Sequence, residues 1–252
     1  MIDSHAHILR EYYDNVDTVI RDVKQKGIIA IVNCGDSIDT SKEVVDYSKK
    51  YFNFVYASVG IHPQNVDEFS EKNMIIIEKM VKIDSVKAIG EIGLDYHYSN
   101  CDKEAQKEMF IRHLELAEKY HKPVIIHSRD AIQDTYDIIK DYDVRGVIHC
   151  YSGSLEMAQL FLKKGFFIGV GGILTFKNAN NLLKVIEKID LNNLLLETDS
   201  PFLSPEPVRG QKNIPINVLY VAQKIAEIKN ITLSDVVKQT TYNALRLFDL
   251  DL

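Results

Sequence analysis

Short apolar runs rich in β-branched residues alternate along this chain with longer stretches in which apolar residues recur every three or four positions. The runs predict buried strands, and the longer stretches predict amphipathic helices. Residues 28–32, Ile-Ile-Ala-Ile-Val, are a typical run, since no position in it is polar. Strands are predicted at residues 2–8, 28–32, 55–61, 86–94, 123–127, 147–150, 166–170 and 194–198.

Helical patterns lie between these runs, and several have recognisable ends. Asp14 is the predicted cap of the first helix, which ends at Gly27; Ser70 is the predicted cap of another, and either Thr232 or Ser234 of the last. Further helices are predicted at about 37–51, 70–83, 103–120, 215–229 and 233–247. Another is predicted to begin near residue 131, and one more to end near residue 162.

Eight strands, each followed by a helix or a helix-bearing loop, indicate the fold class. They predict an α/β protein, a parallel (β/α)8 TIM barrel that forms a single domain over residues 1–252. The alternative is an open doubly wound sheet, which usually has fewer strands.

Composition narrows the class of protein without changing this prediction. The chain has 252 residues, 46% of them hydrophobic, and no apolar run approaches the roughly 20 residues that span a bilayer. The N-terminus does not resemble a signal peptide, and the three cysteines form no Cys-x-x-Cys pair. We therefore expect a reduced, cytoplasmic protein without membrane association. The net charge of -6 gives no bulk attraction for nucleic acid, so a phosphate-bearing substrate would need metal ions and a local cationic rim.

Metal-binding side chains close five of the predicted strands. The first two are His5 and His7, which point to the same side of an extended strand because they are two residues apart. The carboxyl ends of barrel strands open on one face, so all these side chains are expected to meet there. The full set is His5, His7, Glu91, His127, His149 and Asp199.

Each of these residues alone has a simpler interpretation. A buried histidine after an apolar run is more often a hydrogen-bonded core residue than a ligand, and Glu91 could end its strand in an ion pair. However, that interpretation must hold separately for every residue, and ionisable groups at the ends of buried strands are costly without partners. Together the six side chains favour a metal site.

The candidate ligands lie in short motifs spread over nearly the whole chain. These are Ile2-Asp3-Ser4-His5-Ala6-His7, Gly60-Ile61-His62-Pro63, Ile89-Gly90-Glu91-Ile92-Gly93-Leu94-Asp95-Tyr96, Pro123-Val124-Ile125-Ile126-His127-Ser128-Arg129, His149-Cys150-Tyr151-Ser152-Gly153 and Glu197-Thr198-Asp199-Ser200-Pro201-Phe202-Leu203. In order and spacing they resemble the TatD family of metal-dependent hydrolases, in the amidohydrolase superfamily.

The resemblance implies a barrel hydrolase with two divalent metal ions, most often described as a deoxyribonuclease. It implies that Glu91 bridges both ions, that the first is held by His5, His7 and Asp199, and that the second is held by His127 and His149. The chain departs from the family at Ile214, where an acidic residue is usual, and at Tyr151, where phenylalanine is common. Neither is a proposed ligand, but Ile214 leaves open what shapes the rim after the eighth strand.

Imidazole and carboxylate ligands suit zinc, manganese or cobalt and, where oxygen dominates, magnesium. Two neighbouring ions can share a water, lower its pKa and clamp the oxygens of a phosphodiester. A metal-activated hydroxide is therefore the expected nucleophile, with Asp199 as its general base. Glu197 faces the same way as Asp199; either it orients a ligand or a water, or it is an inward strand carboxylate paired with a cation.

Residues after other strands are candidates for substrate contact. His62 is predicted to contact a substrate phosphate or leaving group, and the alternative is a satisfied histidine before a turn proline. Candidate phosphate clamps, although exposed cations are usually only solvated, are Arg129, Arg209 and Lys212. Candidates for stacking on bases, which are individually more typical of ordinary rim aromatics, are Tyr96, Tyr98 and Phe202.

Three functions remain at this stage. The first is a TatD-type deoxyribonuclease, monomeric and exonuclease-like, with single-stranded DNA or DNA ends as substrate. The second is a superfamily hydrolase that acts on an ester, lactone, amide, phosphotriester or aminoacyl bond, which the lack of a basic stripe favours. The third is a non-catalytic metal or scaffold protein, which the complete set of ligand types disfavours.

Overall fold

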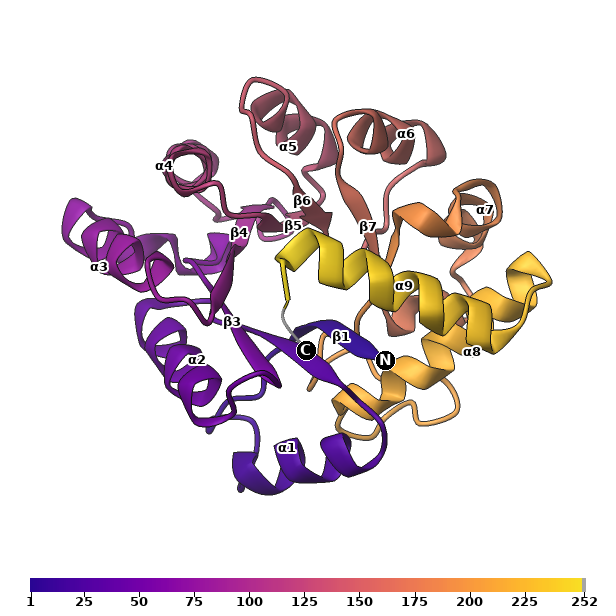
Figure 1. Ribbon diagram of the computed structural model, residues 1–252. Coiled ribbons are helices and arrows are strands. Elements are labelled where there is room, and N and C mark those ends of the chain that lie inside the picture. Colours follow the sequence, from indigo (N-terminus) through magenta and orange to yellow (C-terminus); the bar gives the residue numbers. More distant parts are fainter. Residues whose placement is uncertain (251–252) are drawn as a thin grey trace.

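Eight parallel strands pair in chain order in the computed structural model, which describes residues 1–250 (Figure 1). They are β1 (Ile2–Ala6), β2 (Ala30–Cys34), β3 (Val55–Val59), β4 (Val86–Asp95), β5 (Val124–Arg129), β6 (Gly146–Ile148), β7 (Phe167–Val170) and β8 (Leu194–Leu196). A bridge between Ala6 and Ser200 leads from β8 back to β1, so the sheet is a nearly closed barrel. The predicted single-domain TIM barrel is confirmed, and the doubly wound alternative is wrong.

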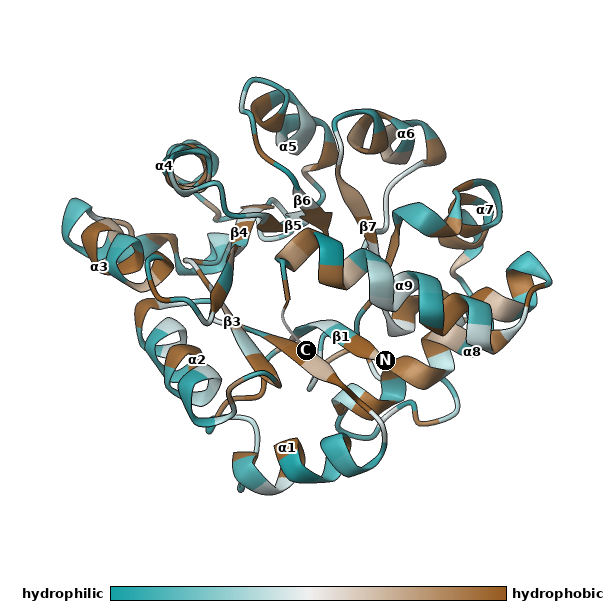
Figure 2. Cartoon of the chain, in the orientation of Figure 1, coloured by the Kyte–Doolittle hydropathy of each residue, from teal (hydrophilic) through white to brown (hydrophobic). Residues whose placement is uncertain are grey.

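Helices surround the barrel, with their hydrophobic sides toward the strands and their polar sides outward (Figure 2). They are α1 (Val16–Gln25), α2 (Ile38–Lys50), α3 (Glu71–Val81), α4 (Lys103–Tyr120), α5 (Ile132–Ile139), α6 (Leu155–Lys163), α7 (Asn180–Lys188), α8 (Val218–Lys229) and α9 (Leu233–Phe248). Short 3-10 helices are η1 (Pro63–Glu68), η2 (Gly172–Thr175), η3 (Leu191–Asn193) and η4 (Pro215–Asn217). Within residues 1–250, none of the helices combines the length and apolar character needed to cross a membrane.

The helix caps test the sequence predictions directly. Ser70 and Thr232 cap α3 and α9, as predicted, through side-chain oxygens that accept backbone N–H groups. Asp14 is not a cap: α1 begins at Val16, so the preceding residue is Asn15, whose side chain accepts the N–H of Thr18. The sequence pattern did not place α7, which begins after Ala179 without any side-chain cap.

The amino-terminal end of the barrel is closed by α9, which lies across the barrel in Figure 1 and contacts β1 and β8. Its residues Ala244, Leu247 and Phe248 join an inner core to which every strand contributes at least one buried side chain, from Ile2 on β1 to Leu195 on β8. Because this end is filled, the opposite end, where the strands finish, is the one available for a site.

The seam between β8 and β1 is joined by side chains and short loops. Asp3 accepts hydrogen bonds from the backbone N–H of Thr198 (2.9 Å) and from its hydroxyl (2.6 Å). Beyond the strands, the N–H of Asp199 donates to the carbonyl of His5 (2.9 Å), and the N–H of His7 donates to Ser200 (2.7 Å). These bonds place Asp199 beside the two histidines of the first strand.

Candidate metal centre

All six predicted ligands meet at the carboxyl end of the barrel, although not all of them at strand ends. Glu91 lies inside β4 and His127 inside β5, because residues Gly93–Asp95 continue to pair with His127–Arg129. His7 follows β1 directly, and Asp199 follows β8 by three residues. The prediction that Glu91 and His127 close their strands is therefore wrong. Their side chains nevertheless meet the other four at the carboxyl end of the barrel, as expected.

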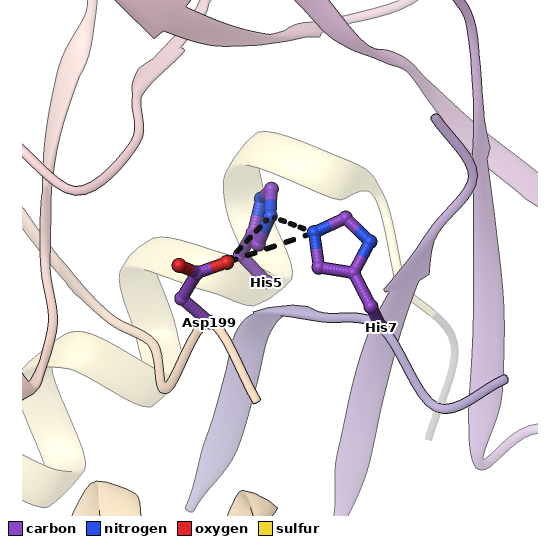
Figure 3. A group of neighbouring side chains, drawn as sticks. All are labelled: His5, His7 and Asp199. Carbon is purple, nitrogen blue, oxygen red and sulfur yellow. Dashed lines mark hydrogen bonds and ion pairs between the residues drawn. The ribbon is translucent and has the colours of Figure 1, made fainter. Parts of the chain in front are cut away.

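His5, His7 and Asp199 point their polar atoms toward one another (Figure 3). Glu91 also lies close to both histidines. The two Nε2 atoms of His5 and His7 are 3.0 Å apart. Glu91 Oε2 lies 3.3 and 3.2 Å from these nitrogens, and Asp199 Oδ1 lies 3.5 and 3.6 Å from them. An ion bound tetrahedrally at about 2.1 Å would space its ligand atoms about 3.4 Å apart. Five of the six spacings among these four atoms are therefore close to those expected of ligands around one ion.

The far side of each ring supports this fit. His7 Nδ1 lies 3.0 Å from the carbonyl oxygen of Cys34, which can only accept, so this nitrogen carries the hydrogen. In the neutral ring the lone pair of His7 is then on Nε2, facing His5 and the two carboxylates. His5 Nδ1 lies 3.5 Å from the Cys34 sulfur. A proton or a metal ion between His5 Nε2 and His7 Nε2 would stabilise this close approach.

Glu91 turns its other oxygen to a second group of histidines. Its Oε1 lies 2.9 Å from His127 Nδ1 and 3.0 Å from His149 Nε2. One carboxylate thus presents Oε2 to the first group and Oε1 to the second, which is the arrangement of a bridging ligand. Glu91 therefore connects two groups of side chains that could hold metal.

His62 also approaches Glu91, with Nε2 at 3.6 Å from Oε1, but its chemistry differs. Its Nδ1 accepts the backbone N–H of Gln64 at 3.1 Å, so in the neutral ring the hydrogen is on Nε2. Burial lowers the pKa of His62 to about 3, which keeps the ring neutral. His62 therefore points a hydrogen-bond donor, and no lone pair, into the centre.

Charge within the centre is balanced by protons on other imidazoles. Burial lowers the pKa of His7, but its hydrogen bonds to Asp199 and Glu91 outweigh that effect and raise the pKa to about 10. Burial raises the pKa of Glu91, yet the neighbouring histidines, His149 first, hold it well below its usual range. A divalent cation would replace protons in this network.

Glu197 supports His149 from behind. Its Oε1 accepts the backbone N–H of Cys150 and lies 3.6 Å from His149 Nδ1, while its Oε2 has no hydrogen-bond partner within residues 1–250. The carboxylate fits only because residue 169 is glycine, where a Cβ would lie 2.5 Å from Oε2. Of the two interpretations of Glu197, this position favours orientation of a ligand over pairing with a cation.

A cavity of about 890 Å³ opens above the centre, and only some of the predicted substrate contacts line it. Arg129 lines it and is the one arginine or lysine on its wall within the described chain. Arg209 instead stacks on Phe176, 3.6 Å from the ring centroid, and Lys212 donates to the backbone carbonyl of Tyr12 at 2.5 Å. The structure therefore does not bring these two predicted clamps to the cavity.

Two of the three aromatic residues predicted to contact substrate line the cavity. Phe202 lines the cavity with 45% of its surface exposed, and its ring lies 6.2 Å from that of His7. Tyr98 lines the cavity as well, half exposed. The hydroxyl of Tyr96 donates to Asp134 at 2.9 Å, and Tyr96 is not on the cavity wall.

Asn213 shapes the rim after β8, where Ile214 departs from the family pattern. Its amide donates to the carbonyls of Thr198 (2.9 Å) and Phe202 (2.7 Å), which ties the loop carrying Asp199 and Phe202. Ile214 packs against the hydrophobic core, and Tyr151 is buried with its hydroxyl donating to Ser154. Both departures are accommodated away from the candidate ligands.

Asp95 is a functional candidate that the sequence reasoning missed. It ends β4, is 1% exposed, and its Oδ2 lies 3.3 Å from His127 Nε2. The signal was present in the sequence, since Asp95 is a carboxylate at the end of an apolar run in the same motif as Glu91.

Comparisons of the whole chain with known proteins identify its family. The model of the family described as TatD related DNase matches residues 2–249. Among similar proteins, the uncharacterized metal-dependent hydrolase YabD of Bacillus subtilis is 39% identical, with all of both chains covered. The uncharacterized metal-dependent hydrolase YcfH of Escherichia coli K12 is 34% identical, with 100% of this chain and 96% of YcfH covered.

Solved structures show the same relationship. YjjV, a TatD homologue from Escherichia coli K12, superposes with a TM-score of 0.94 at 28% identity, covering 100% of this chain and 98% of YjjV. An uncharacterized amidohydrolase from Saccharomyces cerevisiae shares the fold, with a TM-score of 0.82 at 21% identity over 98% of this chain and 99% of its own. The chain belongs to the TatD family of metal-dependent hydrolases.

Proposed function

We propose that this protein is a deoxyribonuclease that holds two divalent ions and cleaves phosphodiester bonds at DNA ends, preferentially in single strands. The observation that carries the proposal is the division of Glu91 between two ligand groups, with Oε2 facing His5 and His7 and Oε1 facing His127 and His149. Two ions held this way are suited to displacement at a phosphodiester.

The residues around the ions have separable tasks. The ions supply positive charge that polarises a phosphoryl oxygen and helps water to lose a proton. Asp199 is the proposed acceptor of that proton, because its side chain is 13% exposed and lines the cavity whereas that of Glu91 is 5% exposed. His62 donates a hydrogen bond from Nε2 to a phosphate oxygen or to the leaving oxygen and keeps its proton.

The walls of the cavity favour a short stretch of substrate. One arginine, Arg129, suits one phosphate, and a long bound strand would require more cations. Phe202, beside His7, offers an exposed ring face or edge to a base next to the scissile bond. These features support action at an end of the strand.

A second function is favoured by a different observation. Glu11, Asp36 and Glu68 line the same cavity, so its wall carries more acidic than basic side chains. A substrate with fewer phosphates, such as an ester, lactone, amide or aminoacyl bond, would meet less repulsion there. The metal centre suits attack on an acyl carbon equally well.

The experiment separates the two functions. The protein is stripped with a chelator, reloaded with zinc, manganese, cobalt or magnesium in turn, and assayed on end-labelled single- and double-stranded DNA and on a panel of ester, lactone and amide substrates. We expect stepwise shortening of single-stranded DNA that depends on metal. If the protein with two bound ions leaves DNA intact and hydrolyses an ester, the second function replaces the first.

A further inference from the structure

Asp95 is a buried carboxylate held in place from several sides. Its Oδ1 accepts the backbone N–H of His97 at 3.0 Å, and its Oδ2 accepts the side-chain amide of Gln64 at 2.7 Å. Buried Gln106 binds its backbone twice, accepting the N–H at 2.9 Å and donating to the carbonyl at 3.1 Å. Both the backbone and the carboxylate of Asp95 are thereby fixed in orientation.

The fixed carboxylate meets the far nitrogen of His127. Asp95 Oδ2 lies 3.3 Å from Nε2, while Nδ1 on the other side of the ring lies 2.9 Å from Glu91 Oε1. Gly93, between the two acids on β4, makes this possible: its φ is +139°, and a Cβ there would lie 2.0 Å from the carbonyl oxygen of His127. The glycine lets β4 approach β5 so closely that Glu91 and Asp95 flank one imidazole.

We infer that Asp95 is a positioning residue, which holds the hydrogen of His127 on Nε2 and so presents the lone pair of Nδ1 to the second ion. The inference rests on the metal centre of the proposed function, but it does not depend on the substrate. A carboxylate that accepts the distal N–H of a ligating histidine fixes the ring and increases the basicity of the ligating nitrogen. Asp95 does not take part in a cluster of three ligand-type groups among the described residues, so we assign it no direct ligand role.

An amide of the same shape cannot replace this carboxylate. Oδ1 faces the N–H of His97, and Oδ2 faces both the Gln64 amide and His127. An asparagine has one oxygen and one NH₂ group, so in either orientation its NH₂ would face a donor. Asp95→Asn therefore keeps the volume and removes the acceptor.

Asp130 supplies a matched control at the same rim. Its Oδ2 lies 3.1 Å from His97 Nδ1, so it also forms a carboxylate–imidazole pair, but the side chain is 66% exposed and the pair does not contact the candidate ligands. Asp130→Asn changes the same chemical group, and asparagine tolerates the positive φ of 54° at this position.

The test measures binding of zinc by calorimetry and by elemental analysis of dialysed protein, without any substrate. In Asp95→Asn we expect affinity for the second ion to fall roughly 10- to 100-fold, with the first ion unchanged. In Asp130→Asn both ions bind as in the wild type. In the zinc-loaded protein labelled with nitrogen-15 histidine, the His127 ring shifts, assigned from a His127→Gln spectrum, should show hydrogen on Nε2 in the wild type and lose this signature in Asp95→Asn.

If Asp95→Asn fails to fold, as judged by circular dichroism, Gln64→Leu carries the test. Gln64 is exposed and donates to the same oxygen, so its loss should weaken the second ion severalfold and spare the first. Equal weakening of both ions, or wild-type binding with an unchanged His127 spectrum, would overturn the role of Asp95. Failure of the wild type to bind a second ion would instead overturn the two-ion basis of the proposed function.

Discussion

The two halves of the metal centre share Glu91 but are built differently. The first half, His5, His7 and Asp199, lies at the seam of the barrel, where the backbone bonds of Asp199 and His7 lock the loop after β8 onto β1. The second half, His127 and His149, lies on β5 and after β6, and each ring has a carboxylate behind it. The first half is thus held by the backbone and the second by side chains.

The halves also differ in the number of lone pairs that they offer. His127 has the most exposed side chain of the candidate ligands, at 17%, whereas those of His5, His7 and His149 are 5% exposed or less. With Glu91, the first half supplies four ligand atoms and the second supplies three, because His62 directs a hydrogen toward it. A closed site suits a permanently held ion, and an open position suits an ion that also meets substrate.

Substitution of Glu91 tests whether the two halves act as one unit, and it should reduce turnover more than the other substitutions. Glu91→Gln leaves one oxygen and one NH₂ group, so one half loses its ligand and faces a donor. Loss of metal-based stabilisation of about 4 kcal/mol corresponds to a fall in turnover of about 10³-fold. Turnover and metal content are measured together; a variant that keeps both ions and full activity would show that Glu91 does not bridge.

Single histidine substitutions should separate the halves. His127→Gln is expected to reduce the bound metal from two ions to one, with affinity for the second ion lowered by more than about 100-fold, since a direct ligand matters more than its support. His5→Gln should instead remove the ion of the first half. Elemental analysis of both variants after dialysis decides this, and identical losses in the two would erase the distinction between the halves.

His113, a buried histidine outside both halves, should report acid destabilisation of the fold itself. Its Nε2 has no partner within the described chain, and burial lowers its pKa from 6.5 to about 4. Between these values the unfolded state binds the proton and the folded state does not, so stability falls as the pH decreases from 6.5 to 4. Across this pH range the shifted pKa of His113 should lower the free energy of unfolding by about 3 kcal/mol.

Urea unfolding of chelator-treated protein between these pH values measures that contribution without interference from metal loss. His113→Leu should be less sensitive to acid than the wild type. An unchanged slope in His113→Leu would assign the acid sensitivity to other groups.

Proton release should accompany metal binding at both halves, since neighbouring carboxylates outweigh burial and raise the pKa of His127 and His149 as well as that of His7. Because the pKa of His7 is raised to about 10, this ring is protonated at neutral pH and must lose its proton when an ion binds. As the pH rises, the binding of metal should therefore tighten by about 1.4 kcal/mol per pH unit for each proton released. Calorimetry in buffers of different ionisation enthalpy counts the protons, and a count of zero for the first ion would contradict this account.

The smallest effects should lie at the cavity wall. Arg129→Ala is expected to raise KM about tenfold, the loss of one charge-assisted contact of about 1.4 kcal/mol. Arg209→Ala is the matched control and should leave KM unchanged, since that side chain stacks on Phe176 outside the cavity wall. Equal effects on KM would place both arginines on the substrate path.

Local features of the structure could be predicted from the sequence because they depend on nearby residues. The apolar run at 28–32 indicated a strand, but β2 begins two residues later, at Ala30, because pairing with β1 and β3 defines its ends. Ser70 identified its own helix cap, whereas Asn15 rather than Asp14 caps α1, a choice made by the residue at which the helix starts.

By itself, the sequence determined the barrel and the six ligand-type side chains, since apolar periodicity and residue chemistry are carried by the chain alone. The tertiary structure decided how those side chains are used. The Cys34 carbonyl, 27 residues from His7, selects its ligating nitrogen, and the extra pairing of β4 with β5 brings Asp95 to His127. The tertiary structure also places the side chains of Arg209 and Lys212 outside the cavity wall. These outcomes depend on contacts between distant segments, which strand register and loop packing create only when the barrel closes.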